Sequence, residues 1–153
     1  MIKKIINADD YGFSLGVNAG IQQAALKGVV NSTSVMVNQK YAWDNLEKLA
    51  HKKNFAIGLH INLTNGKALS KAKQIPLLVD KSGTFKHGFL NLFLIGFIHP
   101  KQLYHQAYIE IKKQLEELKK HHILPTHLDS HRHIHMIPAI FKATKDIQQE
   151  NHI

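Results

Sequence analysis

Short apolar runs alternate along the chain with segments whose apolar residues recur every three or four positions. Three runs rich in β-branched side chains predict buried strands, at residues 2–8, 29–37 and 55–61. The segments between them predict helices, one from Ser14 to Gly28 and one over residues 41–50. Ser14 suits the N-cap of the first helix, and Gly28 suits the position just after its end. Strands that alternate with helices are typical of a parallel α/β sheet or barrel.

The second half of the chain combines a long helix with a histidine-rich segment. Pro100 suits the first turn of that helix. Its expected inner face carries Leu103, Ala107, Ile111, Leu115 and Leu118, with lysines and glutamates outside. The histidine-rich segment follows as a fourth strand, and Pro138 opens a last helix that reaches about residue 149. Residues 66–99 are irregular and apolar toward their end, which predicts an insertion or a lid over a site.

Composition narrows the class of protein only in part. With 153 residues, 44% of them hydrophobic, the chain is long enough for one globular domain. The absence of cysteine excludes disulfides and thiolate metal sites, and it fits a cytoplasmic setting. The formal net charge of +9 favours polyanion partners, but the lysines are dispersed in pairs, so we expect solvated faces rather than a nucleic-acid site. The apolar residues 89–98 make up only half of the roughly 20 needed to span a bilayer, and we expect no membrane partner.

The segment 126–136 (T-H-L-D-S-H-R-H-I-H-M) concentrates groups that bind metals. Five such residues occupy every second position: His127, Asp129, His131, His133 and His135. On an extended strand this spacing places all five on one face. If a helix begins here instead, His131 and His135 lie four residues apart on one side. A polar, solvated loop is the ordinary alternative, but the interleaved apolar residues favour a metal or catalytic role.

Metal-competent residues also occur at the ends of two other predicted strands. Asp9 and Asp10 end the first strand, and His60 ends the third. A helix-capping turn and a structural histidine are the ordinary readings of these positions. In parallel α/β folds, however, the carboxyl ends of the strands meet on one rim, where the chemistry of such folds lies. The sequence therefore predicts one site built from three strand ends.

Four motifs carry a resemblance to a known family. They are N-A-D-D-Y-G at 7–12, N-S-T-S-V-M-V-N at 31–38, G-L-H-I-N-L-T at 58–64 and P-T-H-L-D-S-H-R-H-I-H-M-I-P at 125–138. Together they resemble the YdjC-like carbohydrate deacetylases, which include chitooligosaccharide deacetylases and relatives associated with hopanoid synthesis. The resemblance implies a TIM-like (β/α) barrel and a divalent metal, usually given as magnesium. It also implies an N-acetylated sugar as substrate and hydrolytic removal of the acetyl group.

The resemblance also implies roles for individual residues. Asp9 would be the general base, and Asp10, His60 and His131 would be the metal ligands. The remaining members of the histidine-rich segment would orient those ligands or bind sugar hydroxyls, namely His127, Asp129, His133 and His135. Two imidazoles and one carboxylate favour zinc, manganese or cobalt over magnesium, so the donor set and the family point to different ions.

The chain is shorter than a complete barrel of this type. A (β/α) barrel typically needs about 250 residues, so residues 1–153 would form its amino-terminal half or more. The resemblance also implies a late histidine-containing segment in the active site, which would be missing here. We therefore expect association with a second copy or with a separate carboxyl-terminal half. Two alternatives to an active deacetylase follow: a non-catalytic metal- or sugar-binding fragment, and a basic polyanion-binding protein.

Overall fold

A parallel sheet of four strands forms the centre of the computed structural model, which describes residues 4–153. The strands are β1 (Asn7–Tyr11), β2 (Ser32–Val35), β3 (Ala56–Ile61) and β4 (Leu128–Ser130), and they lie side by side in that order. Every neighbouring pair is parallel. The expected parallel α/β architecture is therefore confirmed at the level of a four-stranded parallel sheet.

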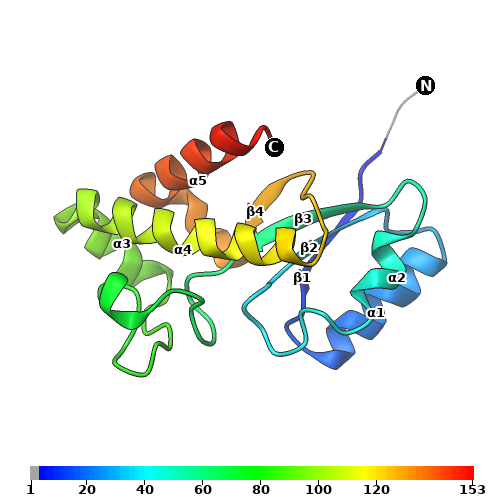
Figure 1. The fold of residues 1–153 in the computed structure, drawn as a ribbon, viewed down its shortest axis with the longest axis horizontal. Helices are drawn as coiled ribbons and strands as arrows, with labels where there is room; N and C mark the ends of the chain where they lie inside the picture. The colour runs from blue at the N-terminus through cyan, green and yellow to red at the C-terminus, as the bar shows by residue number, and fades with distance from the viewer. Residues whose placement is uncertain (1–3) are drawn as a thin grey trace.

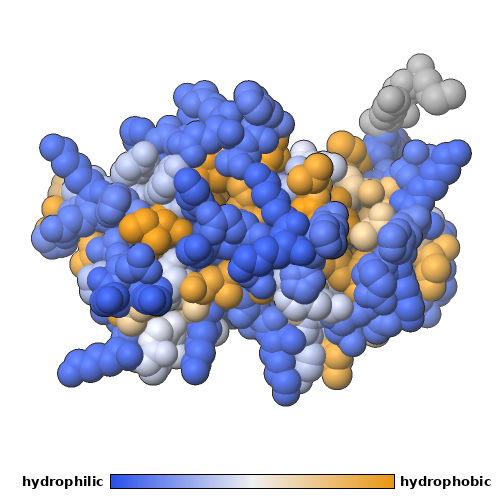
Figure 2. All heavy atoms as spheres, viewed as in Figure 1, coloured by the Kyte–Doolittle hydropathy of each residue, from blue (hydrophilic) through white to orange (hydrophobic). Residues whose placement is uncertain are grey.

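The helices form two groups around this sheet (Figure 1). One group contains α1 (Leu15–Leu26) and α2 (Leu46–Ala50), and α1 packs against β1. The other group contains α3 (Phe89–Ile98), α4 (Pro100–Lys120) and α5 (Pro138–Asn151), and α4 packs against both of its partners and against β3. Two short 3-10 helices complete the fold, η1 (Ala72–Gln74) and η2 (His131–Met136). The face in Figure 2 is largely hydrophilic, and apolar residues reach it only in separate places.

Three of the predicted boundaries are wrong. The first strand does not cover residues 2–8: β1 begins at Asn7 and continues past Asp9 and Asp10, and residues 2 and 3 lie outside the described part. Ile5 and Ile6 are 80% and 47% exposed, so this apolar run is not a buried strand. The second strand is also shorter than predicted, because only part of its apolar run forms hydrogen bonds in the sheet. The second helix is shorter as well, because only its last residues are helical. The apolar runs located these elements approximately, but they did not predict which residues form the hydrogen bonds of the strands and helices.

Helix α4 confirms the predicted apolar face but corrects one side of it. Its five predicted inner residues are 0–2% exposed. The glutamates are not all outside, because Glu110 is fully buried on the inner face with Gln106 and Gln114. Periodicity alone assigns a charged residue to solvent, whereas a buried carboxylate is tolerated when N–H groups compensate it. The contacts of these three side chains are described below.

Helix α3 lies within the segment that was predicted to be irregular. Its sequence, F-L-N-L-F-L-I-G-F-I, is apolar on nearly every side, so no helical period distinguishes it. Leu92 is its buried residue, whereas Leu90 and Phe97 are 75% and 83% exposed. No helix within residues 4–153 has the length and apolar character that crossing a bilayer requires.

Gly12, at the end of β1, sits where the backbone leaves no room for a side chain. Its φ is +100°, and an added Cβ would lie 2.8 Å from the Cα of Ala42. We expect Gly12→Ala to destabilise the fold by about 3 kcal/mol or more, because backbone strain of about 1–3 kcal/mol adds to overpacking of about 1–3 kcal/mol. Denaturant unfolding measures the change.

Gly20 provides the matched control for this prediction. It lies in the middle of α1, and an added Cβ would meet nothing within 4 Å. Gly20→Ala should therefore stabilise the fold by up to about 1 kcal/mol through helix propensity. Equal unfolding midpoints for the two variants would contradict the close approach of Gly12 and Ala42.

Candidate metal centre

The histidine-rich segment changes conformation halfway along its length. β4 ends at Ser130, and η2 begins at His131. Arg132 and His133 have φ values of 55° and 53°, in the left-handed region. The prediction that alternation places all five polar residues on one face is therefore wrong, because alternation holds only while the backbone stays extended. Asp129 and His131 face the site, whereas the other three lie elsewhere.

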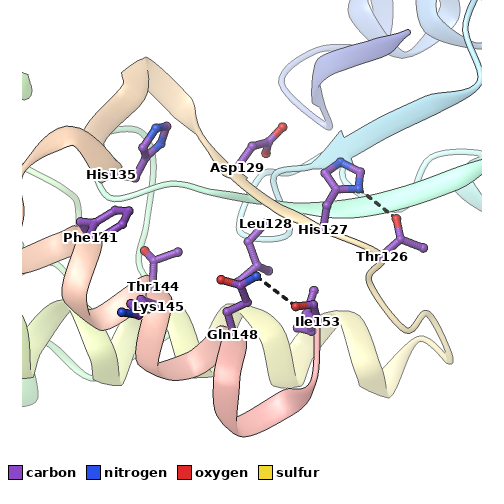
Figure 3. A pocket seen from close by; sticks show the side chains of 10 residues that line it. All are labelled: Thr126, His127, Leu128, Asp129, His135, Phe141, Thr144, Lys145, Gln148 and Ile153. Atoms are coloured by element: carbon purple, nitrogen blue, oxygen red, sulfur yellow. Dashed lines mark hydrogen bonds between the residues drawn. The ribbon is translucent and has the colours of Figure 1, made fainter. Parts of the chain in front are cut away.

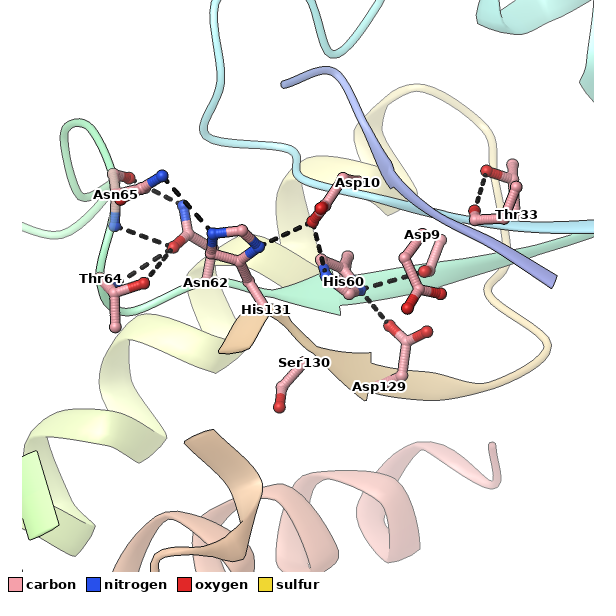
Figure 4. Close-up of polar contacts among 12 residues, drawn as sticks. Asp9, Asp10, Thr33, His60, Asn62, Thr64, Asn65, Asp129, Ser130 and His131 are labelled. Atoms are coloured by element: carbon pink, nitrogen blue, oxygen red, sulfur yellow. Dashed lines mark hydrogen bonds and ion pairs between the residues drawn. The ribbon is translucent and has the colours of Figure 1, made fainter. Parts of the chain in front are cut away.

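Asp9 and Asp10 are adjacent in the sequence, yet both reach the same site, because β1 is irregular where they lie. Neighbouring side chains of a regular strand point to opposite faces. Here the register with β2 shifts between Ala8 and Tyr11, and Asp10 has a φ of 65°. Aspartate tolerates this left-handed conformation better than most residues. With this distortion the Asp10 carboxylate contacts His60, and Asp9 lies near His60 and Asp129 (Figure 4).

Asp10, His60 and His131 form the centre of the site (Figure 4). The Asp10 Oδ1 atom lies 3.0 Å from His60 Nε2 and 2.7 Å from His131 Nδ1. One ligand atom from each residue falls within 4.8 Å of the others. The His60 side chain is 3% exposed and that of Asp10 is 37% exposed, so His60 is buried while Asp10 remains accessible. The structure thus brings together the three residues predicted as metal ligands.

A second set of contacts orients His60 from its other ring nitrogen. Asp129 Oδ1 lies 2.6 Å from His60 Nδ1, and Ser34 Oγ lies 3.1 Å from the same nitrogen. Asp129 directly opposes His60 in the register of β3 and β4. A carboxylate at Nδ1 holds a proton there and fixes the ring with Nε2 facing Asp10, as in the carboxylate–histidine pairs of metal sites. Asp9, His60 and Asp129 also group their ligand atoms within 4.8 Å.

The two histidines differ in their affinity for protons. Burial lowers the pKa of His60, but the hydrogen bond and charge of Asp129 and the charges of Asp10 and Asp9 outweigh it, so the pKa is raised. Burial also lowers the pKa of His131, and there the hydrogen bond to Asp10 does not reverse the effect. A cation at His60 would therefore compete with a proton more strongly than a cation at His131.

The donor chemistry fits a divalent cation. Two imidazoles and a carboxylate are the usual ligands of zinc, manganese and similar ions, and three protein ligands leave positions open for other groups. Asp129 supplies the orienting partner that such a histidine ligand needs. The residue types and their grouping within 4.8 Å therefore fit a divalent cation.

Within residues 4–153, His127, His133 and His135 make no hydrogen bond or ion pair with the three central side chains. The ring of His127 packs against Gly58, where an added Cβ would lie 2.4 Å from its Nε2 atom. His133 is exposed, and His135 Nδ1 lies 2.6 Å from Ser130 Oγ. A cavity of about 500 Å³ lies between β4 and α5, and its lining includes His127, Asp129 and His135 (Figure 3). Asp129 thus connects the central group to this cavity.

Three contacting residues were not predicted from the sequence. Asn7 donates to Asp9 Oδ1 at 2.7 Å, Ser34 approaches His60, and Asn65 Nδ2 lies 3.5 Å from His131 Nε2. All three fall in or beside the four motifs that carry the resemblance. Their amide and hydroxyl groups give no metal signal by themselves, so only their place beside the strand ends could have indicated them.

Removing the partner of His60 should weaken cation binding without abolishing it. We expect Asp129→Ala to lower divalent-ion affinity about 10–100-fold, the usual cost of losing a group that orients a histidine ligand. Asp129→Asn keeps an oxygen that can accept from Nδ1, so its loss should be smaller. Calorimetric titration with Mn²⁺ measures both variants. Equal affinities for wild type and Asp129→Ala would contradict the orienting role.

Comparison with known proteins agrees with these observations. A family model described as YdjC-like protein matches residues 3–153. A carbohydrate deacetylase of Clostridium beijerinckii is 30% identical over 99% of this chain and 58% of its own length. Another, from Thermoanaerobacter pseudethanolicus, is 36% identical over 84% of this chain and 49% of its own length. The chain therefore spans about half the length of the curated relatives it matches.

A solved structure extends the agreement from sequence to fold. It is that of an Enterococcus faecalis protein described as a candidate cellobiose-phosphate cleavage protein. Its TM-score is 0.80 at 28% identity, and the match covers 96% of this chain and 55% of that one. The sequence match over nearly the whole chain and the shared fold lead to one conclusion: the chain belongs to the YdjC-like protein family.

Proposed function

We propose that this chain carries the metal centre of a carbohydrate deacetylase, a hydrolase that removes acetyl groups from N-acetylated amino sugars or their oligosaccharides. The observation that carries the proposal is the convergence of Asp10, His60 and His131 from three different elements. The family and the printed names of the curated relatives supply the reaction and the substrate class.

Asp10, His60 and His131 would hold one divalent ion. When bound, the ion supplies a Lewis acid that polarises an amide carbonyl and lowers the pKa of water. The family resemblance suggests magnesium, whereas the two imidazoles favour zinc, manganese or cobalt. We favour one of the latter three, because Mg²⁺ prefers oxygen ligands.

Asp9 is the proposed general base. It lies near His60 and Asp129, its side chain is accessible, and Asn7 donates to one of its oxygens. The Asp9 carboxylate would accept a proton from water while the water oxygen bonds to the acetamide carbon. The carbon–nitrogen bond then breaks, and the amine leaves with a proton, which gives acetate and the free amino sugar.

The cavity beside β4 is the proposed place for part of the sugar. His127, Asp129 and His135 contribute polar groups to it, and Phe141 contributes an apolar surface. Such a mixture suits a sugar ring, which has hydroxyls on its edge and C–H groups on its faces. His133 is exposed on the same 3-10 helix, and either it or His135 would provide the acid for the leaving amine. Residues 66–99 are the proposed lid over the site, although none of them lines this cavity.

The length of the relatives favours a second candidate. Because the chain matches about half of each relative, it would be a metal- or sugar-binding part of such an enzyme. On either proposal the four-stranded sheet belongs to a (β/α) barrel, completed by a second copy or a separate polypeptide. A role in polyanion binding rests on the net charge alone, and we do not favour it.

Release of acetate from N,N′-diacetylchitobiose tests the first candidate. The purified chain is incubated with the sugar and with Mn²⁺, Zn²⁺, Co²⁺ or Mg²⁺ in turn, and acetate is measured enzymatically. A deacetylase should release acetate with at least one ion and none with a chelator. Tight ion binding without acetate release would favour the second candidate, and neither ion binding nor release would contradict both.

A further inference from the structure

Three buried polar side chains lie one helical turn apart on the inner face of α4. They are Gln106, Glu110 and Gln114, and each is at most 9% exposed. Residues four apart on a helix share one face. Polar groups in a core are costly unless their hydrogen bonds are made. This row, which we call the α4 polar row, therefore needs partners, and it finds them in the chain that follows β3.

Glu110 binds the backbone of that segment at two consecutive residues. Its Oε1 accepts from the Leu69 N–H at 3.0 Å, and its Oε2 accepts from the Ser70 N–H at 2.9 Å. Gln114 Nε2 donates to the same carboxylate at 3.0 Å. Three N–H donors thus compensate a fully buried carboxylate, and the carboxylate fixes the path of residues 69 and 70.

Gln114 binds the same segment closer to the candidate metal centre. Its Oε1 accepts from the Asn62 N–H at 3.1 Å, and its Nε2 donates to the Asn62 carbonyl at 2.7 Å. The Asn62 side chain in turn closes the next turn. Its Oδ1 accepts from the Asn65 N–H at 3.0 Å, and its Nδ2 donates to the Asn65 carbonyl at 2.8 Å. The backbone of Asn65 is therefore held from both of its polar groups.

The side chain of Asn65 lies against the imidazole of His131 (Figure 4). His131 presents Nδ1 to Asp10, and its other nitrogen, Nε2, lies 3.5 Å from Asn65 Nδ2. The amide of asparagine offers both a donor and an acceptor. It can therefore serve Nε2 whether that nitrogen carries the proton or a lone pair.

We propose that Asn65 is a positioning residue for His131, and that the Glu110 and Gln114 part of the α4 polar row holds Asn65 in place through Asn62. The inference rests on the proposed metal centre. Histidines that ligate metals are oriented by a partner on the other ring nitrogen. Asp129 has that relation to His60, and Asn65 has it to His131. His60 is thus oriented by the carboxylate of Asp129, whereas His131 is oriented by an asparagine held in the turn of residues 62–65.

Substitution of Asn65 tests the first step. Asn65 is half-buried, so Asn65→Ala should fold normally and lose about 10–100-fold in Mn²⁺ affinity, the usual cost of losing a ligand's partner. Asn65→Asp retains an acceptor for the Nε2 proton and should bind Mn²⁺ within a few-fold of wild type. Calorimetric titration of each folded variant with Mn²⁺ gives the affinities, and the conservative variant separates positioning from general damage.

Substitution of Glu110 tests the second step. Glu110→Gln keeps the shape but turns an NH₂ group toward one of the two backbone N–H groups. Amide exchange at Leu69 and Ser70 should accelerate at least tenfold, and Mn²⁺ affinity should fall several-fold. Gln106 provides the matched control on the same helix, because its Oε1 accepts from the Leu77 N–H at 2.8 Å, farther along the segment. Gln106→Ala should leave Mn²⁺ affinity unchanged.

Each outcome decides a part of the proposal. If wild type binds Mn²⁺ and Asn65→Ala binds it equally well, Asn65 does not position His131, and the metal centre still stands. If Glu110→Gln accelerates exchange without changing the affinity, the polar row holds the segment but has no role at the centre. If wild type itself fails to bind any of the four ions, the proposed function and this inference are both wrong.

Discussion

Replacing Asp10 with asparagine is expected to lower the divalent-ion affinity of the chain by more than about 100-fold. Loss of a residue that only orients a ligand costs about 10–100-fold, and Asp10 is the one charged ligand among the three proposed. Its Oδ1 atom lies within 3.0 Å of a nitrogen of each histidine, so its charge is central to the group. Calorimetric titration with Mn²⁺ and Zn²⁺ measures the loss.

Asparagine is chosen here because it preserves the backbone. Asp10 has a φ of 65°, and asparagine is among the few residues that tolerate this region. The variant should therefore keep the wild-type unfolding midpoint within a small margin. A folded Asp10→Asn chain with wild-type ion affinity would remove Asp10 from the proposed ligand set.

Replacing Asp9 with asparagine should have the opposite profile. We expect Asp9→Asn to keep its ion affinity and to lose about 10²–10⁴-fold in deacetylation rate, the usual contribution of a general base. Asn7 can turn its amide to meet the new side chain, so the local hydrogen bond can be kept. Acetate release and Mn²⁺ titration on the same sample give both quantities.

The neighbouring carboxylates serve as controls for one another. They are adjacent in β1, and both have a ligand atom close to His60, yet only Asp10 also contacts His131. If Asp9→Asn abolished ion binding while Asp10→Asn retained it, the roles of base and ligand would have to be exchanged. The rate comparison requires a chain with measurable activity, and a full-length relative with the same motifs is suitable where this chain has none.

The location of the site could be predicted from the sequence because it depends on topology. Alternating strands and helices imply a parallel sheet, and the carboxyl ends of parallel strands lie on one rim. The opposition of His60 and Asp129 in the register of β3 and β4 is a further detail, which parallel pairing alone does not determine. The α4 face was equally clear, since its apolar residues keep a strict helical period.

The details within the site could not be predicted because they depend on local distortions. The left-handed conformations of Asp10 and Arg132 break the alternation on which the sequence argument relied. Residues on regular strands would have separated Asp9 from Asp10 and grouped all five residues of the histidine-rich segment. The burial of Glu110 could not be predicted either. The N–H groups that compensate its charge belong to Leu69 and Ser70, which lie in a segment with no regular pattern of apolar residues.

A crystal structure of the chain grown with Mn²⁺ tests the central claim most directly, because anomalous scattering locates the ion independently of any assay. We predict one strong anomalous peak in contact with Asp10, His60 and His131, with Asp129 still bound to the other nitrogen of His60. A peak that contacts Asp9 and Asp129 but neither Asp10 nor His131 would contradict the proposed centre. Crystals that bind no manganese at millimolar concentration would contradict it as well.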